Sequence, residues 1–259
     1  MSAYNTIDII FEQATANAGK PYRLWSDPDQ HYAHNIIARV ADQRQNAPWF
    51  IKKEDWGEGH VVDQDNHGRL YRAELSFYGK ASEVSCPVAV KWMRGEHAIK
   101  GLRKEASMYT GPLRRLQGEV VPRFYGFFTG IVEDVDIGCI VLEWCEDWDL
   151  THKPPPKEEM NERLKAVRRL HAAGVKHGKL YKTRDSVGPF DSRHFLHDKS
   201  GRTRIVGFQH ASLHTCAGGL GKHDDVKVCL DGKCRELCYV EVHWRRACGL
   251  APEAQWQPF

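Results

Sequence analysis

The spacing of apolar residues alternates between stretches typical of strands and stretches typical of helices. Residues 67–75 and 86–92 are rich in β-branched and aromatic side chains, a composition that favours strands. Residues 121–128 and 136–144 return to the same pattern later in the chain. These four segments predict a β-rich region before residue 150.

Helical periodicity occurs in three other places. Apolar residues near 29–45 recur at helical intervals, which predicts an amphipathic helix in an N-terminal extension, residues 1–60. This extension would pack on the domain as a cap or bind a partner. Residues 96–116 predict a second helix. A third helix follows Pro156 and ends at Gly174, a residue suited to a C-terminal cap.

The order of the predicted elements indicates the fold class. Residues 193–208 predict a hairpin across a turn at 198–201. The chain then contains strands, a helix, more strands, a helix, a loop and a hairpin, which is an α+β pattern in two lobes. We expect the first lobe and its connecting segment at 61–150, and the second lobe with a Cys/His-rich tail at 151–259.

Length and composition are those of a globular protein. The 259 residues are 41% hydrophobic and 27% charged, so the chain suits one large domain or two small lobes. A formal net charge of +3, without a dominant basic run, disfavours nucleic acid as a partner. No apolar run approaches the roughly 18 residues that span a bilayer, and the first residues do not resemble a signal peptide. We therefore expect no membrane partner, a cytoplasmic or nuclear location, and eight reduced cysteines.

Several short motifs follow one another in a specific order. VAVKW at 88–92 precedes KEASMY at 104–109, and LEWCEDWDL at 142–150 precedes LHAAGVKHGKL at 170–180. In this order and spacing, the segment from about residue 61 to 211 resembles the protein kinase superfamily. The resemblance implies an α+β, two-lobed protein-kinase-like fold with a small β-rich N-lobe. It also implies a reduced helical C-lobe, because few residues remain after the last motif.

The resemblance also implies a set of nucleotide-binding residues. It suggests that Lys91 contacts phosphates and pairs with Glu105, and that Glu143, Trp144 and Cys145 form a hinge that binds adenine. A separate physical argument favours the pair. Glu105 falls on the buried side of an amphipathic helix, and a buried carboxylate needs a cation to offset its desolvation. The resemblance thus names ATP as the candidate ligand, but we expect weak or absent affinity for it, because the phosphate loop and the metal-binding positions are changed.

Three catalytic positions of that family carry other residues. The resemblance places Lys179 at the proton-accepting aspartate, and His194 and Gly207 at two metal-binding positions. Glycine offers no side-chain ligand and histidine prefers softer metals, so we expect no magnesium site. Asp63 and Asp65 replace glycines of the phosphate-binding loop and would repel phosphates. These changes predict a pseudokinase with weak or no phosphotransfer, which acts by binding or regulation through a protein partner.

A second hypothesis retains phosphotransfer. The HGKL segment also resembles the HGDL of small-molecule kinases, so the alternative is an atypical ATP-dependent phosphotransferase for a protein or a small molecule. Lys91 and Lys179 would then neutralise phosphates. Asp185 or Asp191 would serve as a relocated base or metal ligand.

The C-terminal region is rich in cysteine and histidine. It contains Cys229, Cys234, Cys238 and Cys248, with His210, His214, Cys216, His223 and His243 nearby. Thiolates and imidazoles are the ligands that zinc prefers. However, the spacing contains no CxxC pair, and free cysteines often behave as small buried hydrophobes. We expect these residues to pack in the core and assign no metal site, with structural zinc as the alternative.

Overall fold

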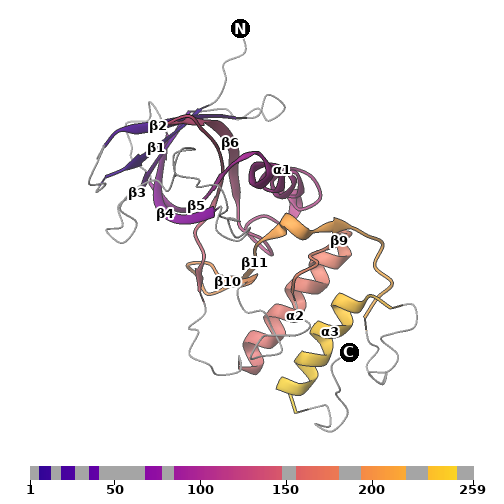
Figure 1. Cartoon of the computed structure of the whole chain (residues 1–259). Coiled ribbons are helices and arrows are strands. Elements are labelled where there is room, and N and C mark those ends of the chain that lie inside the picture. Colours follow the sequence, from indigo (N-terminus) through magenta and orange to yellow (C-terminus); the bar gives the residue numbers. More distant parts are fainter. Residues whose placement is uncertain are drawn as a thin grey trace, which may run out of the picture. The chain divides into compact units, whose positions relative to one another are not determined.

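The computed structural model describes the helices and strands shown in Figure 1. The described residues are 6–12, 19–26, 35–40, 68–77, 85–147, 156–180, 194–219 and 233–249. They belong to two compact units. The first unit combines Met1–Ser107 with Arg123–Trp144, and the second combines Met108–Pro122 with Cys145–Phe259.

The first unit is built around a closed barrel of seven strands. The order around the barrel is β1-β2-β6-β7-β5-β4-β3. β1 and β3 pair in parallel, and the other neighbours are antiparallel. The strands are β1 (Thr6–Phe11), β2 (Pro21–Ser26), β3 (Ile36–Val40), β4 (Gly68–Phe77), β5 (Cys86–Arg94), β6 (Phe124–Val132) and β7 (Val135–Glu143). Closure gives each of these strands a hydrogen-bonded partner on both sides.

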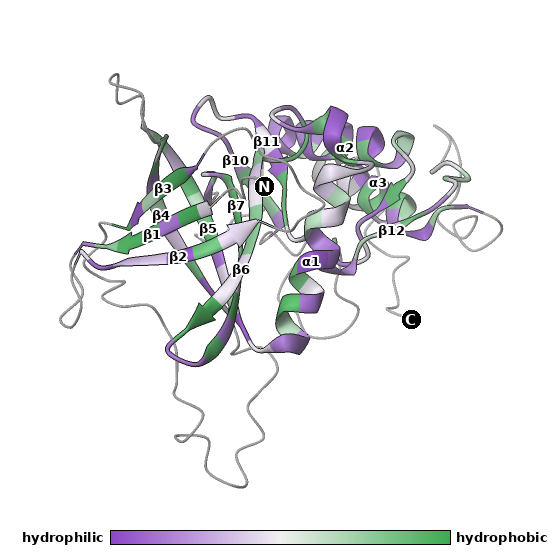
Figure 2. Ribbon diagram, turned by 90° about the horizontal axis from the view of Figure 1, so that it is seen from above, coloured by the Kyte–Doolittle hydropathy of each residue, from purple (hydrophilic) through white to green (hydrophobic). Residues whose placement is uncertain are grey.

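Alternating polarity directs one face of each strand into the barrel. In β2, Tyr22, Leu24 and Ser26 are buried while the residues between them are exposed. Figure 2 shows hydrophobic and hydrophilic positions mixed along the barrel strands. Each barrel strand therefore contributes one apolar face to the interior of the barrel and one more polar face to its outside.

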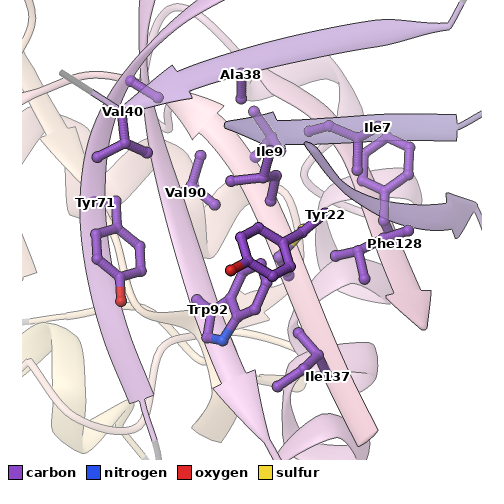
Figure 3. Close-up of a cluster of buried hydrophobic side chains, with 14 of the residues drawn as sticks. Ile7, Ile9, Tyr22, Ala38, Val40, Tyr71, Val90, Trp92, Phe128 and Ile137 are labelled. Carbon is purple, nitrogen blue, oxygen red and sulfur yellow. The ribbon is translucent and has the colours of Figure 1, made fainter. Parts of the chain in front are cut away.

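A hydrophobic cluster fills the barrel (Figure 3). Trp92 of β5 is fully buried in this cluster. The ring of Phe11 lies edge-on to Tyr22, Tyr71 and Trp92, at centroid distances of 5.9, 5.1 and 6.3 Å. Edge-to-face contacts of this kind add to the energy of burial. The interior is thus a packed core.

The helix α1 (Glu96–Thr110) follows β5 after Gly95. It approaches β7 closely at Gly138, where an added Cβ would lie 3.1 Å from the side chain of Ile99. Glycine at position 138 therefore allows α1 and β7 to pack closely against each other.

The second unit combines two helices with two small sheets. The helices α2 (Lys157–Ala172) and α3 (Arg235–Ala247) pack against each other. One sheet has the strand order β11-β10-β8, and the other pairs β12 with β9. The strands are β8 (Glu146–Asp147), β9 (Val175–Lys176), β10 (Phe195–His197), β11 (Thr203–Ile205) and β12 (Ser212–Leu213). Two short 3₁₀ helices, η3 (Arg114–Leu116) and η5 (Phe208–His210), complete the described elements.

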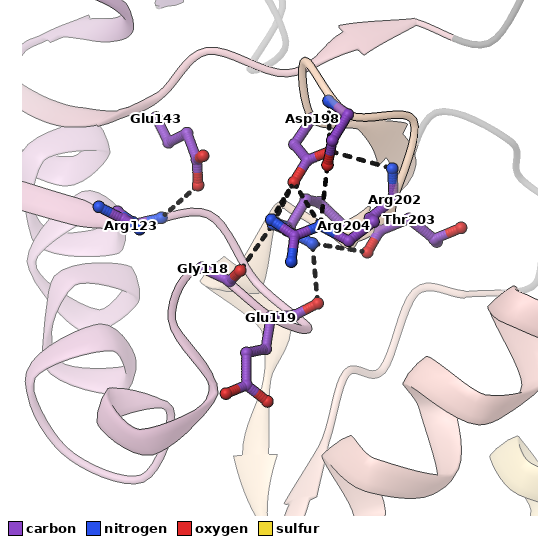
Figure 4. A network of polar contacts seen from close by, with 9 residues as sticks. Gly118, Glu119, Arg123, Glu143, Asp198, Arg202, Thr203 and Arg204 are labelled. Atoms are coloured by element: carbon purple, nitrogen blue, oxygen red, sulfur yellow. Dashed lines mark hydrogen bonds and ion pairs between the residues drawn. The ribbon is translucent and has the colours of Figure 1, made fainter.

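A buried charge network holds the β10–β11 hairpin (Figure 4). Asp198, in the turn, accepts hydrogen bonds from the side chains of Arg202 and Arg204. Arg204 is fully buried and also donates to the carbonyl oxygens of Gly118 and Glu119, at 2.7 and 2.8 Å. One guanidinium therefore joins the hairpin to the segment that follows η3.

The carboxyl group of Asp198 titrates far from its usual range. Burial alone would raise the pKa of Asp198. Hydrogen bonds from Ser200 and from the backbone amide of Arg202, together with the charge of Arg204, outweigh burial and lower this pKa well below its ordinary value. Asp198 is therefore ionised at neutral pH and serves as the counter-charge of Arg204.

The two-lobed protein-kinase-like fold expected from the motifs is wrong. The first unit is a closed seven-stranded barrel, and the described part of the chain contains three α-helices in place of a helical C-lobe. The kinase-like, pseudokinase and transferase-like descriptions that depended on this fold are wrong with it. The physical reason is that periodicity indicates which residues face inward, but it does not indicate whether a sheet closes or how elements connect.

Individual elements were predicted unevenly. The four strands before residue 150, the helix ending at Gly174 and the hairpin at 198–201 are confirmed. Gly174 has a φ of 74°, the left-handed conformation of a C-terminal cap. The helix predicted near 29–45 is wrong, because Ile36–Val40 is the barrel strand β3. None of the α-helices in the described ranges is long and apolar enough to cross a membrane.

Candidate metal centre

Four side chains of the second unit converge in one place. They are His171, His214, Cys216 and Cys234, and each offers one nitrogen or sulfur atom to a cluster in which all four atoms lie within 4.8 Å of one another. His171 is at the end of α2 and Cys234 comes just before α3. The other two residues follow β12. Segments far apart in the sequence therefore supply one common set of donors.

Backbone hydrogen bonds bring these segments together. β12 pairs with β9, and the amide of His214 donates to the carbonyl of Gly174 at 2.9 Å, so the chain after β12 returns to the end of α2. The amide of Cys234 donates to the carbonyl of Gly218 at 2.9 Å. This second bond places the start of α3 beside the same segment. The positions of the donors are thus fixed by the main chain as well as by their side chains.

The distances between the donor atoms fit tetrahedral coordination. From Nδ1 of His171, Nε2 of His214 lies at 3.1 Å, Sγ of Cys216 at 3.5 Å and Sγ of Cys234 at 3.4 Å. A tetrahedral zinc site with Zn–N near 2.0 Å and Zn–S near 2.3 Å separates its ligand atoms by roughly 3.3–3.8 Å. The spacing is close to that required for one metal ion at the centre.

A buried carboxylate orients the imidazole of His171. Oε1 of Glu236 lies 3.0 Å from Nε2 of His171, and both side chains are almost fully buried. Glu236 also accepts hydrogen bonds from the backbone amides of His177 and Gly178, at 2.8 and 2.6 Å. Because a carboxylate only accepts, Nε2 donates to it and Nδ1 keeps its lone pair for the cluster. A carboxylate–histidine pair of this kind commonly supports a metal ligand.

Burial and neighbouring groups shift the protonation of the site. Burial and the nearby His171 lower the pKa of His214. Burial raises the pKa of the Cys234 thiol. For Glu236, burial would raise the pKa, but the hydrogen bonds from His171, His177 and Gly178 lower it overall. An ionised carboxylate and a neutral His214 imidazole therefore coexist at neutral pH.

The sequence had assigned these residues differently. His214, Cys216 and Cys234 were expected to pack in the core, with zinc as the alternative, and the structure joins all three in the cluster. His171 and Glu236 were not recognised as parts of a site. His171 stood inside the LHAAGVKHGKL motif, and Glu236 looked like an ordinary acid in the first turn of a helix. The only local signal was the short spacing between His214 and Cys216.

The remaining members of the Cys/His-rich tail lie elsewhere. Cys238 is buried in α3, as core packing predicts, and Cys248 is half-buried just after the helix. Neither belongs to the four-residue cluster. Cys229 and His223 lie outside the described residues, and the side chain of His243 is likewise not described.

The predicted pairing of Lys91 with Glu105 is confirmed. Nζ of Lys91 on β5 lies 2.7 Å from Oε2 of Glu105 on α1. The carboxylate is buried, and about three quarters of the lysine side chain is covered, since 23% of it is exposed. The pair joins a barrel strand to α1. A role in nucleotide binding stays a prediction for both residues.

Replacing Glu105 with glutamine is expected to destabilise the first unit by about 1.5–3 kcal/mol, the usual range for a hydrogen bond to a charged group. The amide cannot neutralise the Lys91 ammonium, which sits against a buried partner. Urea unfolding followed by tryptophan fluorescence measures the change. A double-mutant cycle with Lys91→Met gives the coupling energy of the pair, and a coupling near zero would contradict this account.

The three residues of the predicted hinge lie where the chain passes from the first unit to the second. Glu143 ends β7 and accepts a hydrogen bond from the amide of Arg123 at 3.2 Å. Trp144 donates its amide to the carbonyl of Pro87 at 3.2 Å. Cys145 is buried and belongs to the second unit. A role in adenine binding therefore remains untested for these residues.

The three residues expected to replace catalytic residues lie in the second unit. Lys179 is exposed, and its amide donates to Nδ1 of His177 at 3.2 Å. Nδ1 of His194 donates to the carbonyl of Val206 at 3.1 Å. Gly207 has a φ of 85° before η5, and a Cβ added there would lie 2.9 Å from Nδ1 of His194. Glycine at 207 is therefore explained by backbone geometry and close packing.

Gly207→Ala is expected to lower the stability of the second unit more than Gly201→Ala does. Both glycines have positive φ, 85° and 77°, so both substitutions carry about 1–2 kcal/mol of backbone strain. Only Gly207 also faces a neighbour, because nothing lies within 4 Å of a Cβ added at Gly201. Thermal melts of the two variants measure the difference. Equal losses of stability would show that His194 moves aside without cost.

Four acidic residues invoked for the phosphate loop or for relocated catalysis are not placed by the structure. Asp63, Asp65, Asp185 and Asp191 lie outside the described residues. Their proposed roles are therefore untested.

The comparison with known proteins gives no family assignment. No model of a known protein family matches the chain, and no curated protein matches it significantly in sequence. The likeness to protein kinases gains no support from these searches.

Proposed function

We propose that this chain is a zinc-binding protein whose second unit is held together by a structural metal ion. The observation that carries the proposal is the convergence of His171, His214, Cys216 and Cys234 within 4.8 Å. The Glu236 carboxylate behind His171 strengthens it, because a histidine that binds a metal commonly donates its other ring N–H to a carboxylate.

The donor set favours zinc over other common ions. Two thiolates and two imidazoles in a tetrahedron suit Zn²⁺, whereas magnesium and calcium prefer oxygen ligands. Tetrahedral sites with two sulfur and two nitrogen donors are typical of zinc or of iron–sulfur centres. One compact set of four donor atoms fits a single metal ion rather than an iron–sulfur cluster.

The arrangement supports a structural role for the ion. Catalytic zinc sites usually have three protein ligands and leave a fourth position for water or substrate. Here four protein donors would fill the tetrahedron. The ligands come from the end of α2, the segment after β12 and the start of α3, so the ion would connect three parts of the second unit.

A structural ion supplies no reaction centre, so we further propose that the protein acts by binding a protein partner. Trp25 on β2 and Ile131 on β6 support this, because they are 44% and 69% exposed on strands that pair with each other. Aromatic side chains are enriched in the cores of protein interfaces. Phosphotransfer is not needed to account for either feature.

Metal analysis of the purified protein tests the zinc proposal. We expect one zinc ion per chain after growth in zinc-containing medium. Replacement by cobalt is expected to give the visible absorption of a tetrahedral site with thiolate ligands. Protein that is fully folded without any metal, and that takes up neither ion, would contradict the proposal.

A further inference from the structure

The two sulfur donors of the metal centre lie in different surroundings. Cys234 is 8% exposed and stands immediately before α3. Cys216 is half-buried in a segment without regular secondary structure, and its neighbours Thr215 and Ala217 are exposed. One sulfur is therefore anchored, and the other belongs to a segment that a small molecule can approach.

The two sulfurs are also close enough to form a disulfide with little rearrangement. Their Sγ atoms lie within 4.8 Å of each other, and a disulfide needs about 2.05 Å. The hydrogen bond from the Cys234 amide to the Gly218 carbonyl keeps the two backbone segments together. Since the segment of Cys216 carries no helix or strand, it can supply most of the movement.

We propose that Cys216 and Cys234 form a peroxide-sensitive modification site in which a disulfide replaces the bound zinc ion. This inference rests on the proposed zinc site. It assigns hydrogen peroxide, or an alkyl hydroperoxide, as the reacting class of molecule. Zinc and the disulfide exclude each other, because a thiolate that has entered a disulfide no longer binds the ion.

The reaction is balanced by the peroxide alone. The Cys216 thiolate attacks one peroxide oxygen, the O–O bond breaks, and a sulfenic acid forms as hydroxide leaves; from an alkyl hydroperoxide an alkoxide leaves and takes a proton from water. The Cys234 thiolate then attacks the sulfenic sulfur, an S–S bond forms, and the S–O bond breaks to release a second hydroxide. Two electrons pass from the thiolates to the peroxide, and Zn²⁺ leaves the site.

Loss of the ion would leave only the two histidines as donors. His171, at the end of α2, remains hydrogen-bonded to Glu236 in the first turn of α3, and both side chains are buried. The new disulfide would still join the segment after β12 to the start of α3. The link between this segment and α2, however, would lose its metal. Oxidation therefore removes the metal link between α2 and the segment after β12, whereas the disulfide keeps that segment joined to the start of α3.

The test uses the zinc-loaded full-length protein and measures zinc release with a chromophoric chelator during peroxide treatment. We expect one zinc ion to be released per chain. Peptide mass spectrometry is expected to find a disulfide between Cys216 and Cys234, and thiol reduction to restore zinc binding. Cys248→Ser removes a cysteine outside the cluster and should release zinc at the native rate.

A second variant separates this inference from the zinc proposal. Cys216→His keeps four nitrogen or sulfur donors but removes the second thiol, so it should bind zinc and release it at least about tenfold more slowly under peroxide. Zinc release from this variant at the native rate would overturn the inference while leaving the zinc site intact. Native protein that keeps its zinc under peroxide, or that forms a sulfinic acid without a disulfide, would also overturn it. Native protein that never binds zinc would instead refute the proposed function.

Discussion

Cys234→Ser is expected to abolish stoichiometric zinc binding and to unfold the second unit under conditions in which the native protein is stable. Structural zinc contributes about 10 kcal/mol or more to the folding of small metal-dependent domains, which rivals the whole stability of many domains. In its described residues the second unit has two α-helices, two short 3₁₀ helices and strands of only two or three residues, so we expect that its packing alone does not replace that energy. Limited proteolysis and circular dichroism measure the loss.

Cys248→Ser provides the matched control for this experiment. It makes the same chemical change at a cysteine outside the cluster and should retain zinc and a native melting curve. Chelator treatment of native protein should reproduce the Cys234→Ser phenotype. If Cys234→Ser and Cys248→Ser lose stability equally, the metal does not hold the second unit together.

Asp198→Asn is expected to destabilise the second unit by about 3 kcal/mol, because removing one partner of a buried ion pair leaves an uncompensated charge. Arg204 is fully buried, and Asp198 is the carboxylate that faces its guanidinium. Glu162→Gln is the control, since it breaks an exposed pair with Lys165 that contributes less than about 1 kcal/mol. Chemical denaturation of both variants at pH 7 gives the comparison.

The contribution of Asp198 should depend on pH in a specific direction. The folded-state pKa lies well below the unfolded value of about 3.9, so the stabilisation is complete above that value and disappears as the pH falls through the folded-state pKa. The difference in unfolding free energy between the native protein and Asp198→Asn should be constant from pH 7 to about 5 and shrink below about 4. Because both proteins carry the metal site, its own acid sensitivity cancels in this difference. If the difference in unfolding free energy between the two proteins became larger in acid, the assigned ion pair would be contradicted.

The sequence was informative about local structure and misleading about architecture. The strands β4 to β7, the helix α2 and the β10–β11 hairpin followed from periodicity and turn residues. The β-branched residues of Ile36–Val40 were read with helical spacing, although their pairing with β1 and β4 makes them a strand. Barrel closure depends on pairing between distant segments, and no local pattern encodes it.

The residue types of the candidate site were predictable from the sequence, but the particular residues that come together were not. The cysteine and histidine content indicated a zinc alternative, and three of the four residues of the cluster were among those named. His171 is 63 residues from Cys234 along the chain, so only the tertiary fold reveals that their donor atoms lie together. The Lys91–Glu105 pair, in contrast, was predictable because a buried carboxylate on a helix requires a nearby cation.

The strand order of the barrel has a consequence for how the protein is made. β2 completes its pairing only with β6, where Trp25 meets Thr129. At roughly 5–20 residues per second, a ribosome needs on the order of 10 s to produce the chain between these partners. During that interval the N-terminal hairpin of β1 and β2 has an open edge, and the apolar face around Leu24 lacks its final cover. The edge of β2 therefore stays unpaired until β6 has left the exit tunnel, and this is the interval in which we expect the nascent chain to be most prone to aggregation.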